Sequence, residues 1–236
     1  MSPQNLAAAV AEVRERIARA ARDAGRSAQS VTLLAVGKAH PAALLAAAAG
    51  CGIRDFGESY LQEALEKIAA LRELSLTWHF IGRIQANKTR PIAEHFAWVH
   101  GVDRLKVAER LSAQRPAHAP PLNVCLQVNV AGELSKGGAA PEELPALATA
   151  VAALPRLVLR GLMCIPPEET EAARQRAWFA RLRVLQEQLN AGGSHLDTLS
   201  MGMSGDFAAA ILEGATIVRV GTALFGARPA EARPAE

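Results

Sequence analysis

The sequence predicts an α/β protein folded as a single (β/α)8 barrel of the TIM type. Eight short apolar runs alternate with helical patterns, and a polar residue or glycine follows nearly every run. An open, doubly wound parallel sheet is the alternative. The count of eight favours closure, and closure would bring the polar strand ends together on one face. The expected strands are 31–38, 55–59, 77–82, 98–102, 123–130, 159–165, 198–203 and 216–221.

Helical patterns separate these runs, and one further helix precedes them. Leu6, Val10, Val13 and Ile17 form an apolar stripe at helical spacing, and Gly25 is a suitable stop signal. Acidic residues interrupt the positive face of this segment, so a docked structural helix is expected there and not a targeting peptide. The other expected helices are 41–50, 60–74, 104–114, 141–154, 170–189 and 206–213.

Composition limits the classes of function. The chain has 236 residues, half of them hydrophobic, and a net charge of +3 from 26 basic and 23 acidic residues. This balance argues against a nucleic-acid surface, and no stretch is long and apolar enough to span a membrane. Three scattered cysteines without metal-ligand spacing suggest reduced, buried thiols in a cytoplasmic protein. Residues 1–226 are expected to form the barrel, and 227–236, one pentapeptide written twice, a disordered tail.

The first chemical signal is a lysine at the end of an apolar run. VTLLAVGK places Lys38 where the first strand should end. It could be a solvated strand end, because lysine is seldom buried. It could also be a lysine at the mouth of a pocket, where desolvation makes the amine a nucleophile toward carbonyl groups.

The second signal is a pair of Gly-, Ser- and Thr-rich junctions after the seventh and eighth runs. Barrels often bind phosphate at these two loops through backbone N–H groups at the start of a short helix. Ser204 and Thr222 offer hydroxyl groups, and Gly221 permits close approach of an anion. The alternative, that Ser204 and Thr222 only cap helices, is compatible with a phosphate site.

The third signal is Arg219, an arginine within an apolar strand, on the same face as Gly221. Such an arginine needs a partner, either a carboxylate such as Glu58 or Asp103, or a ligand in the barrel. A lysine, an anion site and an arginine together suit pyridoxal 5′-phosphate (PLP), which has an aldehyde, a phosphate and a ring nitrogen. A phosphosugar aldolase that forms a Schiff base would use the same lysine and phosphate parts.

Seven stretches also resemble one known family. LLAVGKAHP, DFGESYLQE, WHFIGRIQANK, LQVNVAGELSKGG, RGLMCIP, LSMGMSGDF and VRVGTALFG occur in the order typical of the pyridoxal-phosphate homeostasis protein family, which is related to the N-terminal barrel of alanine racemase. The resemblance spans residues 31–226. It implies PLP held as an aldimine on Lys38, phosphate contacts from Ser204, Gly221 and Thr222, and Arg219 facing the pyridine nitrogen.

Three further positions are candidates for the site, namely Lys136, Ser59 and His79. The resemblance associates Lys136 with PLP handling, although by its chemistry this is an ordinary loop lysine. Ser59 stands where the family commonly has asparagine, so a hydroxyl replaces an amide near the cofactor. His79 either lines the pocket or makes a hydrogen bond inside the barrel. The family also commonly has Ser-Lys-Thr where this chain has Gly-Lys-Ala at 37–39.

The expected role is PLP homeostasis without efficient turnover. An arginine beside the ring nitrogen disfavours the protonated ring that absorbs electrons during catalysis. Racemases with this arginine need a second acid–base group, a tyrosine from another domain, whereas the single tyrosine here is Tyr60. We therefore expect a monomer that buffers PLP or passes it to apo-enzymes by transient contact. A PLP-dependent racemase or lyase of low activity is the alternative.

Overall fold

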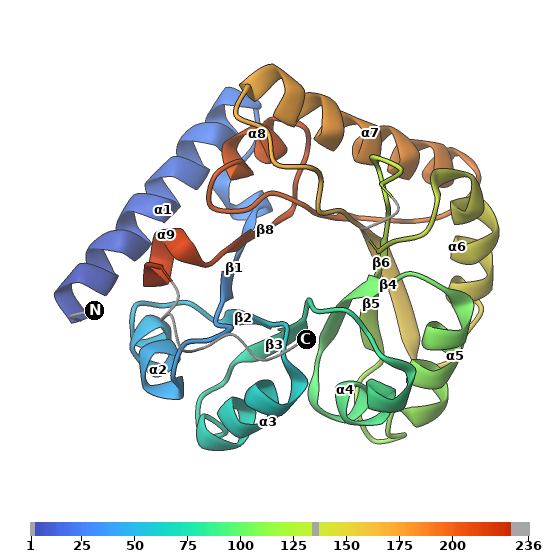
Figure 1. Cartoon of the computed structure of the whole chain (residues 1–236), viewed down its shortest axis with the longest axis horizontal. Coiled ribbons are helices and arrows are strands. Elements are labelled where there is room, and N and C mark those ends of the chain that lie inside the picture. The colour runs from blue at the N-terminus through green and yellow to red at the C-terminus, as the bar shows by residue number, and fades with distance from the viewer. Residues whose placement is uncertain (1–2, 134–136, 228–236) are drawn as a thin grey trace.

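The chain folds into a closed barrel of eight parallel strands, in which each strand pairs with its neighbours in sequence and β8 pairs with β1 (Figure 1). The computed structural model describes residues 3–133 and 137–227. The predicted fold class is therefore confirmed. The strands are β1 (Thr32–Val36), β2 (Asp55–Glu58), β3 (Thr77–Phe80), β4 (Trp98–Val102), β5 (Leu122–Gln127), β6 (Leu157–Met163), β7 (Thr198–Ser200) and β8 (Ile217–Val220).

Helices surround the barrel, and the amino-terminal one lies outside the strand–helix alternation. Leu6, Val10, Val13 and Ile17 are all buried, as their spacing predicts, and α1 runs along the side of the molecule beside α8 and α9 (Figure 1). The α-helices are α1 (Pro3–Asp23), α2 (Ala42–Gly50), α3 (Leu61–Ala70), α4 (Thr89–His95), α5 (Leu105–Gln114), α6 (Leu144–Ala152), α7 (Ala172–Ala191), α8 (Phe207–Leu212) and α9 (Thr222–Phe225).

Seven of the eight strands end before their apolar runs do, and β5 and β7 end earliest, three residues short. The fifth run was expected to extend to Val130, but β5 ends at Gln127, after which Val128 makes an isolated bridge to Ala139. The seventh run ends as a strand at Ser200, because Gly202 adopts a left-handed φ of 91° and turns the chain. Both loops therefore begin nearer to the barrel than the sequence indicates.

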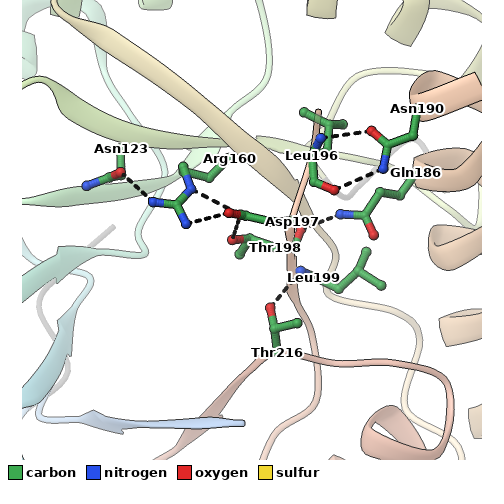
Figure 2. A network of polar contacts seen from close by, with 9 residues as sticks. All are labelled: Asn123, Arg160, Gln186, Asn190, Leu196, Asp197, Thr198, Leu199 and Thr216. Atoms are coloured by element: carbon green, nitrogen blue, oxygen red, sulfur yellow. Dashed lines mark hydrogen bonds and ion pairs between the residues drawn. The ribbon is translucent and has the colours of Figure 1, made fainter. Parts of the chain in front are cut away.

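A polar network ties β6 to the start of β7 (Figure 2). Arg160 binds Asp197 through two hydrogen bonds, of 3.0 Å from Nε to Oδ1 and 2.6 Å from Nη2 to Oδ2. The Gln186 amide of α7 donates to the Thr198 carbonyl at 2.9 Å. The paired geometry of a guanidinium with a carboxylate restricts orientation as well as distance, so this network sets the register of the shortest strand.

The thiols of Cys125 and Cys164 are fully buried, and burial raises the pKa of each to about 12. They are therefore inert side chains of the core. Cys51 is also a free thiol but is partly exposed, which differs from the expectation that all three are buried. Within residues 3–133 and 137–227, no helix is long and apolar enough to cross a membrane. Residues 228–236 of the predicted tail lie outside the described residues.

Candidate functional site

The barrel brings five of the predicted residues to one face. In a closed parallel barrel all carboxyl-terminal strand ends open on the same side, where such folds carry their sites. Lys38 follows β1 and Ser59 follows β2, while Ser204 follows β7. Gly221 and Thr222 come directly after β8. These residues lie far apart in sequence, and the closure of the sheet places them all at the same end of the barrel.

Lys38 lies in a tight turn between β1 and α2. Its neighbour Ala39 has a φ of 65°, in the left-handed region that costs a non-glycine residue about 1–2 kcal/mol. The Ala39 N–H donates to Glu63 Oε1 at 2.7 Å, and the Gly37 carbonyl accepts a hydrogen bond from Lys67 at 2.7 Å. Side chains of α3 thus hold the backbone on both sides of Lys38.

The loop after β7 meets the start of α9. Ser204 Oγ accepts a hydrogen bond of 3.2 Å from the Ala223 N–H, in the first turn of that helix. The Gly202 carbonyl accepts the Arg219 N–H at 2.9 Å, which ties the same loop to β8. A Cβ at Gly202 would lie 2.9 Å from Phe207 Cα, so only glycine fits here. This close packing holds a hydroxyl group beside the exposed end of a short helix.

Arg219 is buried and has no carboxylate partner among the described residues. Its Nη1 donates to the Ser200 carbonyl at 2.7 Å and to Ser200 Oγ at 2.9 Å, and its Nη2 donates to the Cys164 carbonyl at 2.9 Å. The carboxylate interpretation of Arg219 is therefore wrong. Burial lowers the pKa of Arg219 below its ordinary value, but carbonyl and hydroxyl acceptors suit the cationic form.

Glu58 and Asp103, the two carboxylates considered as partners of Arg219, pair with other cations. Glu58 binds Lys67, and Asp103 binds the adjacent Arg104. The Arg219 guanidinium is held instead by the carbonyl and hydroxyl groups of Ser200 in β7 and by the carbonyl group of Cys164, directly after β6.

His79 supports a hydrogen bond inside the barrel, which was one of the two roles expected of it. His79 Nδ1 lies 3.0 Å from His100 Nε2, and His100 Nδ1 lies 2.7 Å from Ser200 Oγ. This row of hydrogen bonds ends at Asp55, whose Oδ1 lies 3.1 Å from His79 Nε2. Strands β4 and β7 are not neighbours, so this contact crosses the barrel interior.

The hydrogen bonds that link Ser200, His100, His79 and Asp55 all run in one direction, from the serine to the aspartate. The Asp55 carboxylate can only accept, so His79 donates to it through Nε2. Burial favours the neutral form of both rings, so His79 Nδ1 accepts from His100 Nε2, and His100 Nδ1 accepts from the Ser200 hydroxyl. Both neutral histidines therefore carry their proton on Nε2.

We expect both histidines to stay predominantly neutral at pH 6.5, where an ordinary histidine is half protonated. Burial lowers the pKa of His79, and burial with the nearby Arg219 charge lowers that of His100 further. NMR of ¹⁵N-labelled imidazole rings would measure this, with the urea-unfolded chain as the reference. Two rings that titrate as in the unfolded chain would contradict the assignment.

The remaining predicted residues differ in what can be said of them. Ser59 directly follows β2 and lines a surface cavity together with Tyr60, Gly82 and Arg83. Lys136 lies outside the described residues. Its proposed part in PLP handling stays a prediction.

The sequence analysis assigns no role to four side chains that take part in this region: Glu63, Lys67, His100 and Ser200. Lys67 and Glu63 lie four residues apart on α3, and Lys67 is buried beside Ala64 on the apolar face of that helix. A lysine on an apolar face was the available signal. His100 and Ser200 lie in expected strands, but only barrel closure shows that they meet.

Comparison with known proteins fits this architecture. Residues 10–229 match the family model described as the N-terminal domain of alanine racemase. A curated relative from Pseudomonas aeruginosa, the "Pyridoxal phosphate homeostasis protein", is 66% identical over 219 residues, which cover 93% of this chain and 94% of the relative. The chain belongs to the pyridoxal phosphate homeostasis protein family. A relative of the same name from Escherichia coli K12 is 52% identical over 222 residues, covering 93% of this chain and 95% of the relative.

Solved structures agree with the family. PipY of Synechococcus elongatus, determined with PLP bound, has 39% identity and a TM-score of 0.82, over 94% of this chain and all of PipY. Alanine racemase from Corynebacterium glutamicum shares the barrel with a TM-score of 0.67 but only 18% identity, over 95% of this chain and 62% of the racemase. The second likeness shows the fold alone.

Proposed function

We propose that this chain binds PLP at the carboxyl-terminal face of its barrel and takes part in PLP homeostasis. The observation that carries the proposal is the grouping of an amine, an anion cradle and a buried guanidinium at one end of a closed barrel. The name of the family and the PLP-bound PipY structure support it independently.

The residues present fit the group. Ser204 Oγ and the backbone N–H groups at the start of α9 are the kind of donors that bind a phosphate. The phosphate would therefore sit between the β7 loop and α9. When bound, the cofactor supplies an aldehyde that condenses with an amine, and Lys38 is the amine at this opening.

Arg219 would face the ring nitrogen of the cofactor. Its positive charge disfavours protonation of that nitrogen and so weakens the ring as an electron acceptor. Because its guanidinium is held by two carbonyl groups and a hydroxyl group, it cannot easily turn away. We infer from this charge that the chain retains PLP and does not turn over amino acids efficiently. Three further properties stay predictions: that the protein is a monomer, that it is cytoplasmic, and that it passes PLP to apo-enzymes.

Borohydride trapping tests the proposal. The purified chain is incubated with PLP, reduced with borohydride, digested and analysed by mass spectrometry. We expect one phosphopyridoxyl group, on the peptide that contains Lys38. An unmodified protein, or modification spread over several lysines, would overturn the assignment.

A second measurement addresses turnover. The PLP-loaded protein is incubated with alanine in deuterated water, and the exchange of the α-hydrogen is followed by NMR. We expect exchange at rates far below the usual enzymatic range of roughly 1–1,000 per second. Exchange within that range would instead identify a racemase or a lyase.

A further inference from the structure

A buried cluster of three charged side chains surrounds the turn that carries Lys38. Lys67 Nζ donates to Glu58 Oε1 at 2.9 Å and also contacts Glu63 Oε1. The exposed fraction is 5% for the Lys67 side chain and zero for that of Glu58, while Glu63 is partly exposed. We name these three residues, Glu58, Lys67 and Glu63, the α3 clamp.

The α3 clamp reaches the backbone on both sides of the nucleophile. Lys67 Nζ donates to the Gly37 carbonyl at 2.7 Å, and Glu63 Oε1 accepts the Ala39 N–H at 2.7 Å. The residue held between these two hydrogen bonds is Lys38. Ala39 has a left-handed φ, a conformation that persists only when its surroundings determine it.

The packing around Gly37 shows how tightly this turn is enclosed. A Cβ at Gly37 would lie 2.6 Å from Glu58 Oε1 and 2.8 Å from a methyl group of Leu45. Any larger residue would push the carboxylate away from Lys67. The absence of a side chain therefore lets the clamp contact the Lys38 turn directly.

We propose that Glu58, Lys67 and Glu63 are positioning residues for Lys38, which hold its turn in place and couple the reactivity of its amine to the charge of Glu58. The proposal rests on the function proposed above, in which Lys38 is the attachment point of PLP. None of the three residues needs to touch the cofactor to act in this way.

The charge of Glu58 is the adjustable part of the clamp. Its second carboxylate oxygen, Oε2, is buried and has no hydrogen-bond partner among the described residues. Burial raises the pKa of Glu58 to about 7, against the lowering effect of Lys67, while Glu63 raises it and Lys38 lowers it to smaller extents. These are the charged groups that face Glu58 from α3 and from the β1–α2 turn.

The direction of the coupling follows from charge. Attraction is mutual, so the Lys38 ammonium that favours ionised Glu58 is itself favoured by ionised Glu58. An ionised Glu58 carboxylate therefore favours the charged, unreactive form of Lys38 over the neutral amine. Glu58→Gln removes this charge and should increase the reaction rate of Lys38 with an amine reagent at pH 8, by about fivefold.

The first experiment uses the protein without cofactor. Hydrogen exchange of the Ala39 N–H is compared in wild type, Glu63→Ala, Glu63→Gln and the matched control Glu66→Ala, an exposed glutamate on the same helix whose partner is Gln62. We expect at least tenfold faster exchange in Glu63→Ala only, because the glutamine can still accept the hydrogen bond. Equal exchange in Glu63→Ala and wild type would overturn the positioning role.

The second experiment follows the Lys38 amine. Its labelling by trinitrobenzenesulfonate is measured from pH 6 to 9 in wild type, Glu58→Gln and Glu66→Ala. We expect an inflection near pH 7 in wild type and in Glu66→Ala, which Glu58→Gln loses. An unchanged pH profile in a folded Glu58→Gln protein would overturn the coupling.

PLP capture separates the two proposals. If wild type does not capture PLP on Lys38, the proposed function fails, and the exchange and labelling results still decide whether the clamp acts on Lys38. If wild type captures PLP and all the variants capture it at the wild-type rate and with the same pH profile, the proposed role of the clamp is wrong while the proposed function stands. Glu63→Ala alters a partly exposed side chain, so it keeps the test available should Glu58→Gln not fold.

Discussion

Lys38→Ala should abolish covalent retention of PLP. A Schiff base needs a primary amine at the carbonyl carbon, and alanine has none. The proposed phosphate site at Ser204 and the start of α9 is untouched by the change, so PLP should still bind weakly and wash out on dialysis. We expect visible absorption by the dialysed protein to fall at least tenfold, with no borohydride adduct.

Two controls accompany this variant. Lys38→Arg keeps a positive charge but is not a nucleophile at neutral pH, so it should behave as Lys38→Ala does. Lys106→Ala removes an exposed lysine from α5 and should retain PLP as wild type does. If Lys38→Ala carries a stoichiometric adduct after dialysis, another lysine is the attachment point and the assignment of Lys38 is wrong.

Gly161→Ala should destabilise the barrel severely. A Cβ at Gly161 of β6 would lie 1.8 Å from the carbonyl oxygen of Thr198 and 2.6 Å from its carbonyl carbon. These are backbone atoms of the neighbouring strand β7, in register with Gly161, and they cannot rotate away. Separating the strands would also disturb the adjacent Arg160–Asp197 pair (Figure 2). We expect a loss of more than about 3 kcal/mol in the free energy of unfolding.

Gly50→Ala is the matched control for that change. A Cβ at Gly50, the last residue of α2, meets no atom within 4 Å. Alanine reduces the freedom of the unfolded chain and favours helix, so the variant should be neutral or more stable by about 0.5–1 kcal/mol. Urea unfolding of the three proteins measures both effects. A Gly161→Ala protein as stable as wild type would show that β6 and β7 do not approach as closely as the structure has them.

Local patterns were sufficient for the architecture. Apolar runs ending in polar residues located all eight strands, and the stripe from Leu6 to Ile17 located α1. The ends of strands were less predictable. The run after Thr198 is apolar to Met203, yet the strand stops at Ser200, because a left-handed glycine turns the chain toward Ser204. Met201, just after the end of β7, is buried in the core without being part of a strand, whereas Met203, beyond the turn, is exposed.

By itself, the sequence determined the barrel, the position of Lys38 at a strand end and the glycine- and serine-rich loops after β7 and β8. These are properties of consecutive residues, so hydrophobic periodicity and turn-forming residues predict them. The partners of buried charges were decided only by the tertiary structure. Arg219 binds the carbonyl groups of Ser200 and Cys164 in place of a carboxylate, and His100 meets Ser200 across the barrel from 100 residues away. The clamp that holds Lys38 depends on Lys67, 30 residues beyond the carbonyl it binds. Pairing at such separations depends on which side chains closure of the sheet brings into one desolvated space, and no local pattern records that.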